Sequence, residues 1–154
     1  MHKLISPIPV LITILVLITV SCSNSQKPKP DLEKGFMDLS SWNWEENGIV
    51  DLNGEWEFYW GQLLEPDDFK TNNTIKPEYM NVPGEWAQNG YATYRLQVRV
   101  PDINTDYNFI FSSMSSSAKL WINGTLCMQR GRVGSYKDQS KPQWIHKYYT
   151  PIQY

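Results

Sequence analysis

Apolar and polar residues alternate with a period of two along residues 55–60 and 94–100, which indicates strands with one buried face. In the first run, Trp56, Phe58 and Trp60 fall on one side and the acidic residues between them on the other. Similar short runs predict further strands at residues 49–52, 79–82, 107–112, 118–122 and 125–129. The chain is therefore predicted to be mostly β, and no chemistry carried by helices is expected.

Turn residues separate these runs. Asn123-Gly124 lies between two candidate strands, and both residue types tolerate the positive φ angles of a type I′ hairpin turn. Along the first strand of this hairpin, Lys119 and Trp121 share the face opposite the apolar residues. A helical turn is expected at residues 66–69, because proline suits a first helical position. Short strands joined by frequent turns favour a β-sandwich or jelly roll.

The N-terminus has the features of an export signal. Lys3 precedes a charge-free run over residues 4–20, which ends in small residues just before Cys22. A cysteine at this point is typical of a bacterial lipoprotein processing site, although Thr19 stands where leucine is usual. We expect a signal peptide over residues 1–21 and lipidation of Cys22. Ordinary cleavage nearby and an uncleaved signal anchor are the alternatives.

The remaining chain divides into two parts by composition. Residues 22–40 are polar with interspersed lysine and proline, and are predicted to be a tether. Residues 41–154 have room for one β-sandwich domain. The net charge of −2 is mild and no basic stripe is evident, so nucleic-acid binding is disfavoured.

Four motifs occur in a fixed order, and together they resemble known families. They are LNGxWxF at 52–58, VPxxW at 82–86, YxxxVxVP at 94–101 and WING at 121–124. The stretch over residues 49–143 resembles the N-terminal sugar-binding domain of family 2 glycoside hydrolases. It is still more similar to the extracytoplasmic domain of bacterial seven-transmembrane receptors with diverse intracellular signalling modules. This resemblance implies a galactose-binding-like jelly roll that acts as a sensor or binding module, and it names no ligand.

The C-terminal segment departs from that family pattern. The family's sandwich continues with at least one more strand, whereas here residues 142–149 are followed closely by Pro151 and the end of the sequence. We expect a jelly roll that lacks its last strand or strands, with an unpaired edge prone to aggregation. An early stop, a frameshifted end and a deliberately short domain each explain such a sequence.

Catalytic and metal-binding patterns are weak. Glu45-Glu46 and Asp67-Asp68 are adjacent in the sequence, so their side chains point in different directions on a strand. In family 2 glycoside hydrolases the catalytic carboxylates belong to a separate barrel domain. His146 has no ligand-like spacing to Cys127, which is more simply a small packed side chain. No enzyme activity, cofactor or metal is expected.

Aromatic and arginine side chains are the candidates for ligand contact, because sugar rings stack on aromatic faces. The candidates are Trp86, Tyr91, Arg95, Trp121 and Arg132. For Trp86 the alternative is a purely structural role in packing. The function expected is a non-catalytic extracytoplasmic sensor-type module that binds a small carbohydrate or glycan. A structural or interaction lipoprotein, a truncated receptor remnant and a non-catalytic hydrolase fragment are the alternatives.

The same features predict where the protein acts. It is expected to be exported and held at a bacterial membrane through the lipid on Cys22, facing the periplasm or the cell surface. A membrane protein is a candidate partner.

Overall fold

The computed structural model describes residues 28–70, 75–114, 116–143 and 145–152. The signal peptide predicted at residues 1–21 and the lipidation site Cys22 lie outside the described residues. The elements, in chain order, are β1 (Leu32–Glu33), β2 (Phe36–Asp38), α1 (Trp44–Asn47), β3 (Gly54–Trp60), η1 (Pro66–Phe69), β4 (Glu78–Val82), β5 (Ala92–Arg95), β6 (Gln97–Arg99), β7 (Tyr107–Met114), β8 (Ala118–Ile122), β9 (Thr125–Arg130) and β10 (Ile145–Ile152). The predicted all-β class is confirmed.

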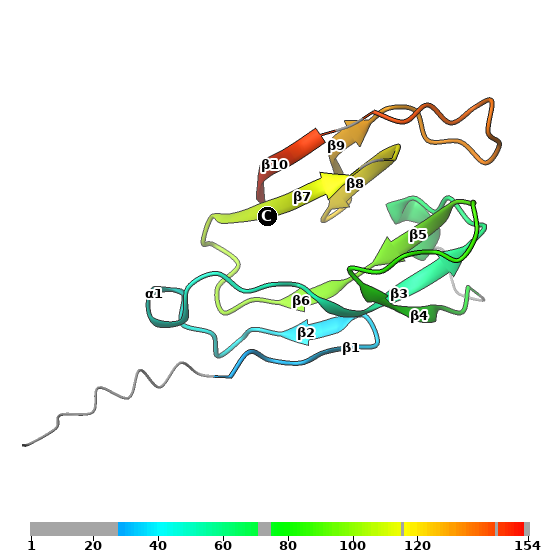
Figure 1. Ribbon diagram of the computed structural model, residues 1–154. Coiled ribbons are helices and arrows are strands. Elements are labelled where there is room, and N and C mark those ends of the chain that lie inside the picture. The colour runs from blue at the N-terminus through cyan, green and yellow to red at the C-terminus, as the bar shows by residue number, and fades with distance from the viewer. Residues whose placement is uncertain (1–27, 71–74, 115, 144, 153–154) are drawn as a thin grey trace, which may run out of the picture.

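The strands form four small sheets arranged in two layers (Figure 1). One layer contains the sheets β1-β2-β6 and β4-β3-β5, and the other contains β10-β7 and β8-β9. All pairs are antiparallel except β2 and β6, which run parallel. Within the part of the chain that the structure describes, no helix is both long and apolar enough to cross a membrane.

Gly35 joins the two sheets of the first layer. Its amide donates to the Glu55 carbonyl at 2.8 Å, and its own carbonyl accepts from the Gln97 amide at 2.8 Å. The backbone of Gly35 has a φ of 72°, which glycine adopts without the steric cost that other residues incur. A Cβ at this position would lie 2.5 Å from Cγ of Glu57, so the turn between β1 and β2 packs directly on β3.

The main apolar core lies in the β1-β2-β6 sheet. It includes part of the segment that we predicted to be a tether. Leu32, Met37 and Leu39 are buried together with Trp42, and Met37 is 0% exposed. The tether predicted over residues 22–40 is therefore wrong from Leu32 onward. These apolar residues are dispersed among charged ones, so the composition of the segment gave no sign that it packs.

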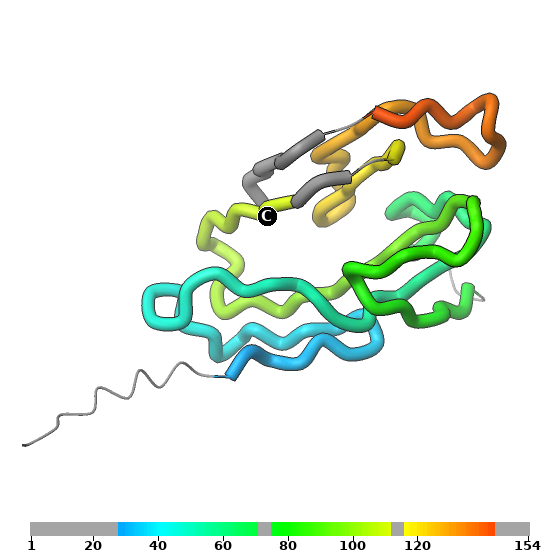
Figure 2. The backbone as a smooth tube through the Cα atoms, viewed as in Figure 1, coloured from blue at the N-terminus to red at the C-terminus, as the bar shows by residue number. Residues whose placement is uncertain are grey.

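The segment after this core also differs from the prediction. No strand forms at residues 49–52, and instead α1 begins after Asn43, whose side chain accepts from the amides of Glu45 and Glu46. Residues 42–53 run alongside the β1-β2-β6 sheet (Figure 2). Val50 and Leu52 of this segment are partly buried against the core. Irregular backbone thus buries apolar side chains that were expected to lie in a strand.

Both faces of β3 carry packed aromatic side chains. The predicted alternation holds on one face, where Phe58 lies between the rings of Trp60, Trp86 and Tyr94 at centroid distances of 5.9, 6.2 and 5.0 Å. Tyr59, on the opposite face, is also buried. The prediction of a strand with one buried face is therefore incomplete.

The second layer contains the predicted hairpin and one strand that was not predicted. Asn123 and Gly124 have φ angles of 50° and 83° between β8 and β9, as a type I′ turn requires. The strand β10 pairs along β7 from Ile145 opposite Met114 to Ile152 opposite Tyr107. The C-terminal segment, from which we expected no closing strand, therefore pairs along one edge of β7. The helical turn predicted at residues 66–69 is confirmed as η1, whereas the strand predicted at 94–100 is divided into β5 and β6.

Candidate ligand-binding surface

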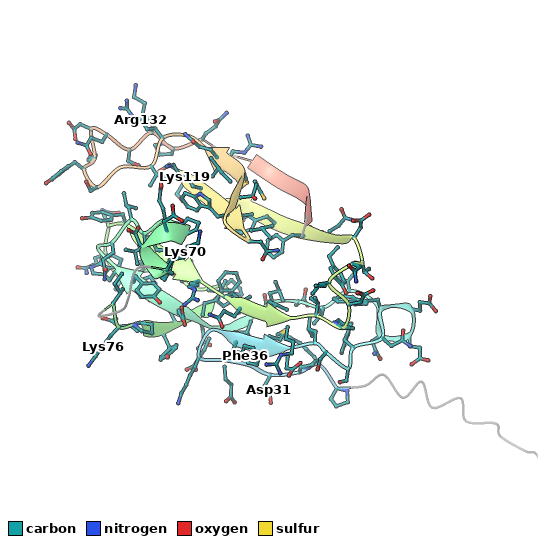
Figure 3. The ribbon with its side chains drawn as sticks, turned by 180° about the vertical axis from the view of Figure 1, so that it is seen from behind. Asp31, Phe36, Lys70, Lys76, Lys119 and Arg132 are labelled. Atoms are coloured by element: carbon teal, nitrogen blue, oxygen red, sulfur yellow. The ribbon has the colours of Figure 1, made fainter. Side chains whose placement is uncertain are left out.

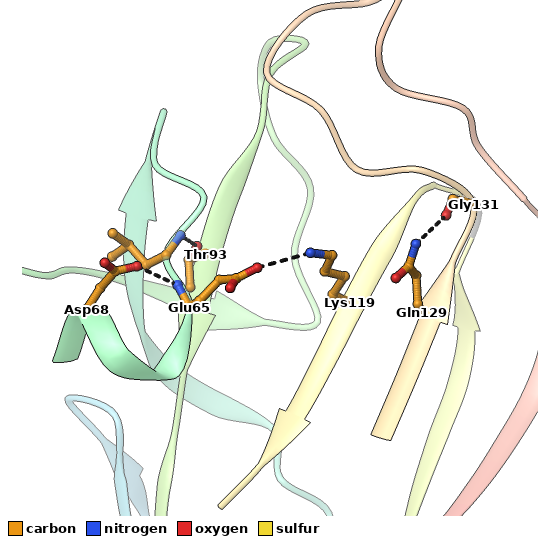
Figure 4. A network of polar contacts seen from close by, with 7 residues as sticks. Glu65, Asp68, Thr93, Lys119, Gln129 and Gly131 are labelled. Carbon is orange, nitrogen blue, oxygen red and sulfur yellow. Dashed lines mark hydrogen bonds and ion pairs between the residues drawn. The ribbon is translucent and has the colours of Figure 1, made fainter. Parts of the chain in front are cut away.

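The polar face of the β8–β9 hairpin lies opposite the start of η1. Lys119 on β8 forms an ion pair with Glu65, with 3.0 Å between Nζ and Oε1. Its ammonium group also lies 5.4 Å from the centroid of the Trp121 ring, two residues further along the same face. Gln129 is directly opposite Lys119 on β9 (Figure 4). We call these four residues, Glu65, Lys119, Trp121 and Gln129, the hairpin surface.

Local geometry fixes each part of the hairpin surface. The type I′ turn sets the register of β8 and β9, with an irregularity between Leu120 and Trp121. Glu65 is the N-cap of η1, and its amide donates to Asp68 Oδ2 at 2.8 Å. The preceding residue, Leu64, donates its amide to Thr93 Oγ1 at 2.8 Å, which fastens this loop to β5. These bonds fix the backbone at Glu65 in the opposite layer, from which its carboxylate reaches Lys119.

Trp121 and its neighbours remain accessible to solvent. Trp121 is half-buried, and the side chains of Lys119 and Glu65 are 31% and 58% exposed. The surface thus combines one partly open indole ring with a cation, a carboxylate and an amide. Such a set can stack on an apolar ring face and exchange hydrogen bonds with hydroxyl groups.

The other predicted tryptophan, Trp86, has a packing role. Its ring meets Trp60 edge-on at 5.2 Å and stacks with Tyr94 at an interplanar angle of 21°. Its Nε1 donates to the hydroxyl of Tyr94 at 2.7 Å. The ring and the polar atom of Trp86 are both engaged within the aromatic cluster on β3, which favours the structural alternative for this residue.

Arg95 belongs to a separate charged network. It forms an ion pair with Glu57 at 3.0 Å, and Tyr59 donates its hydroxyl to the same carboxylate oxygen at 2.8 Å. The guanidinium also lies 4.8 Å from the centroid of the Phe69 ring. Burial, reinforced by the hydrogen bond to Glu57, raises the pKa of Tyr59 to about 12. Because the Glu57 side chain is only 14% exposed, this network fastens η1 to the sheet more readily than it binds a ligand.

Tyr91 and Arg132 form hydrogen bonds with residues outside the hairpin surface. The carbonyl of Tyr91 accepts from the Gly61 amide at 2.9 Å, at the start of β5. Arg132 donates to the carbonyls of Gln139 at 2.6 Å and Asp138 at 3.3 Å, within its own loop (Figure 3). The five predicted residues therefore do not converge on one site.

Of those five, only Trp121 belongs to the hairpin surface. Sequence reasoning placed Lys119 on the same face as Trp121 but did not consider it as a ligand contact. Nothing in the sequence pattern joined Glu65 to a residue that follows it by 54 positions.

Two other features bear on ligand and metal binding. A shallow cleft of about 550 Å³ lies between residues 29–33 and 53–55, and no aromatic side chain lines it. Among the described residues, no group of three or more His, Cys, Asp or Glu side chains is placed to hold a metal ion. The hairpin surface is therefore the best candidate for binding.

No protein-family model, curated protein or solved structure matches this chain.

Proposed function

We propose that this protein is a non-catalytic, extracytoplasmic binding module that holds a carbohydrate against the hairpin surface. The observation that carries the proposal is the partly open ring of Trp121 beside the Lys119–Glu65 ion pair. The two-layered arrangement of short, mostly antiparallel sheets is compatible with a galactose-binding-like jelly roll, and that finer assignment is part of the proposal.

The chemistry of the hairpin surface suits a sugar. A pyranose presents an apolar face of C–H groups, which stacks on an indole, and a rim of hydroxyl groups. Lys119 supplies donors, Glu65 supplies acceptors and the amide of Gln129 supplies both. Because Lys119 and Glu65 already satisfy one another, a sugar exchanges these bonds rather than adding new ones. We therefore expect weak binding, in the micromolar to millimolar range, or roughly 4–8 kcal/mol.

The proposal is for binding without catalysis. Glycoside hydrolysis usually requires two carboxyl groups about 5–9.5 Å apart across the substrate. The hairpin surface as defined contains one carboxylate, Glu65, which Lys119 engages. A single ion-paired carboxylate supports orientation of a hydroxyl group rather than acid–base chemistry.

Export and anchoring complete the proposal. The apolar run before Cys22 favours a signal peptide, and acylation of this cysteine would hold the module at the membrane surface. A membrane protein that receives the binding signal is the partner we propose.

A glycan array followed by calorimetry tests the proposal on the full chain in non-ionic detergent. We expect one class of glycan to bind and the variant Trp121→Ala to lose that binding. Tyr79→Ala is the matched control, because Tyr79 is also a partly exposed aromatic residue on a strand. Equal loss in both variants, or hydrolysis of a chromogenic glycoside, would contradict the proposal.

A structural or interaction lipoprotein is the second candidate. It is favoured by the engagement of Trp86 and Arg95 in packing and ion pairing, which leaves them little capacity to bind a ligand. If the folded chain binds no glycan on the array, this second candidate replaces the first.

A further inference from the structure

Charge is distributed very unevenly between the two layers. Residues 35–69 hold nine acidic side chains and no lysine, arginine or histidine. Residues 116–143 hold five basic side chains and one acidic side chain. The first segment belongs to the layer of β2 and β3, and the second to the layer of β8 and β9 (Figure 1). The mild net charge of −2 therefore conceals an acidic layer and a basic layer.

The basic charge of the second layer extends into the loop over residues 131–143, which we call the basic loop. It lies at the end of the molecule opposite α1 (Figure 1). Lys137 and Lys141 are exposed, and neither forms an ion pair with any described residue. Tyr136, next to Lys137, is 67% exposed. An accessible aromatic ring thus lies next to a lysine that forms no ion pair with a described residue, in a loop whose one acidic side chain is Asp138.

The backbone of the basic loop is held in one shape. Arg132 and Lys141 exchange two backbone hydrogen bonds of 2.9 Å at its base. The amides of Gln139 and Ser140 both donate to the Tyr136 carbonyl at 3.0 Å, and the Arg132 side chain binds two further carbonyls of the loop. A loop that is already ordered loses less conformational entropy when it binds a ligand.

We propose that the basic loop is a second binding site, specific for an anionic polysaccharide and independent of the hairpin surface. Lys137 and Lys141 pair with carboxylate or sulfate groups along the polymer, and Tyr136 stacks on a sugar ring between them. At about 0.15 M salt the Debye length is about 8 Å, so the distant acidic layer opposes this contact only weakly. The exposed ring favours a sugar polymer over an acidic protein surface, since it offers a face for C–H groups.

Affinity electrophoresis tests this proposal on the full chain in non-ionic detergent, with polygalacturonate, neutral dextran or single-stranded DNA in the gel. We expect retardation by polygalacturonate and not by dextran. With the two lysines engaged, binding should weaken roughly tenfold between 50 and 200 mM salt. The double variant K137Q/K141Q should abolish most of this binding and its salt dependence.

The control variant K70Q/K76Q removes the same charge from exposed lysines of the other layer and should bind as the unaltered chain does. Arg132 is left in place because it holds the loop. Trp121→Ala should also retain polygalacturonate binding, which separates this site from the hairpin surface. Equal weakening in the control, tighter retardation by DNA than by polygalacturonate, or no retardation by either polymer would overturn the proposal.

Discussion

Replacing Phe58 with alanine removes the ring at the centre of the aromatic cluster on β3. Phe58 is 3% exposed and contacts Trp60, Trp86 and Tyr94, with ring centroids between 5.0 and 6.2 Å away. Its removal leaves a cavity between these rings. The backbone of β3, of β5 and of the loop before β5 sets their positions. Because Tyr94 is held opposite position 58 by the pairing of β3 with β5, we expect the rings to close this space only in part.

The expected cost of Phe58→Ala follows from this packing. Burial and cavity effects of a phenylalanine-to-alanine change amount to about 3–5 kcal/mol in a well-packed core. A domain of this size is stable by about 5–15 kcal/mol, so the variant should fold with a clearly lowered midpoint. Phe58→Leu keeps most of the volume and should cost less than about 1.5 kcal/mol.

Urea denaturation of the full chain, followed by tryptophan fluorescence, measures these differences. Ile103→Ala is the control, because Ile103 lies in a loop and is 62% exposed, and it should change stability by less than about 0.5 kcal/mol. Phe58→Ala and Ile103→Ala with equal midpoints would refute the assignment of this face of β3 to a packed core.

Three further predictions concern other parts of the chain. Gly90→Ala should lower the free energy of unfolding by about 1–3 kcal/mol, because its Cβ would lie 2.5 Å from the packed Trp60 ring; urea midpoints check this. Fatty-acid labelling should mark the unaltered chain but not Cys22→Ala, and label that persists in the variant contradicts lipidation. The pKa of Tyr59 rises on folding from 10.0 to about 12, so the stabilisation is complete below pH 10 and is lost as the pH rises through 12. Between pH 10 and 12 the unaltered chain should lose up to about 2–3 kcal/mol of stability through the ionisation of Tyr59, and Tyr59→Phe should not show this loss. Urea denaturation at the two pH values measures the difference.

The sequence predicted the elements that depend on residues close together along the chain. The alternation of Trp56, Phe58 and Trp60 identified one packed face of β3, and Asn123-Gly124 identified the hairpin and its turn. Local patterns were insufficient where packing involves distant segments. Met37 lies opposite Val98 in the pairing of β2 with β6, some sixty residues later in the chain, and Val98 packs against its core.

The strand β10 illustrates a second limit. We expected the sandwich to lack its last strand, because residues 142–149 are followed closely by Pro151, and proline cannot donate a backbone hydrogen bond. In the described sheet β10 has β7 as its neighbour on one side, so the position of Pro151 opposite Asn108 is compatible with pairing. For the candidate site, periodicity placed Lys119 beside Trp121, but the approach of Glu65 depends on how the two layers meet.

The indole N–H resonances of the seven tryptophans report directly on whether a glycan binds at Trp121. The full chain in detergent, labelled with nitrogen-15, is titrated with a glycan that binds on the array, and Trp121→Phe assigns the relevant signal. We predict that the chemical shift of Trp121 changes in a saturable manner. The chemical shift of Trp86, whose indole donates to Tyr94 inside the cluster, should not change. A saturable shift of Trp86 with no change at Trp121 would contradict binding at the hairpin surface.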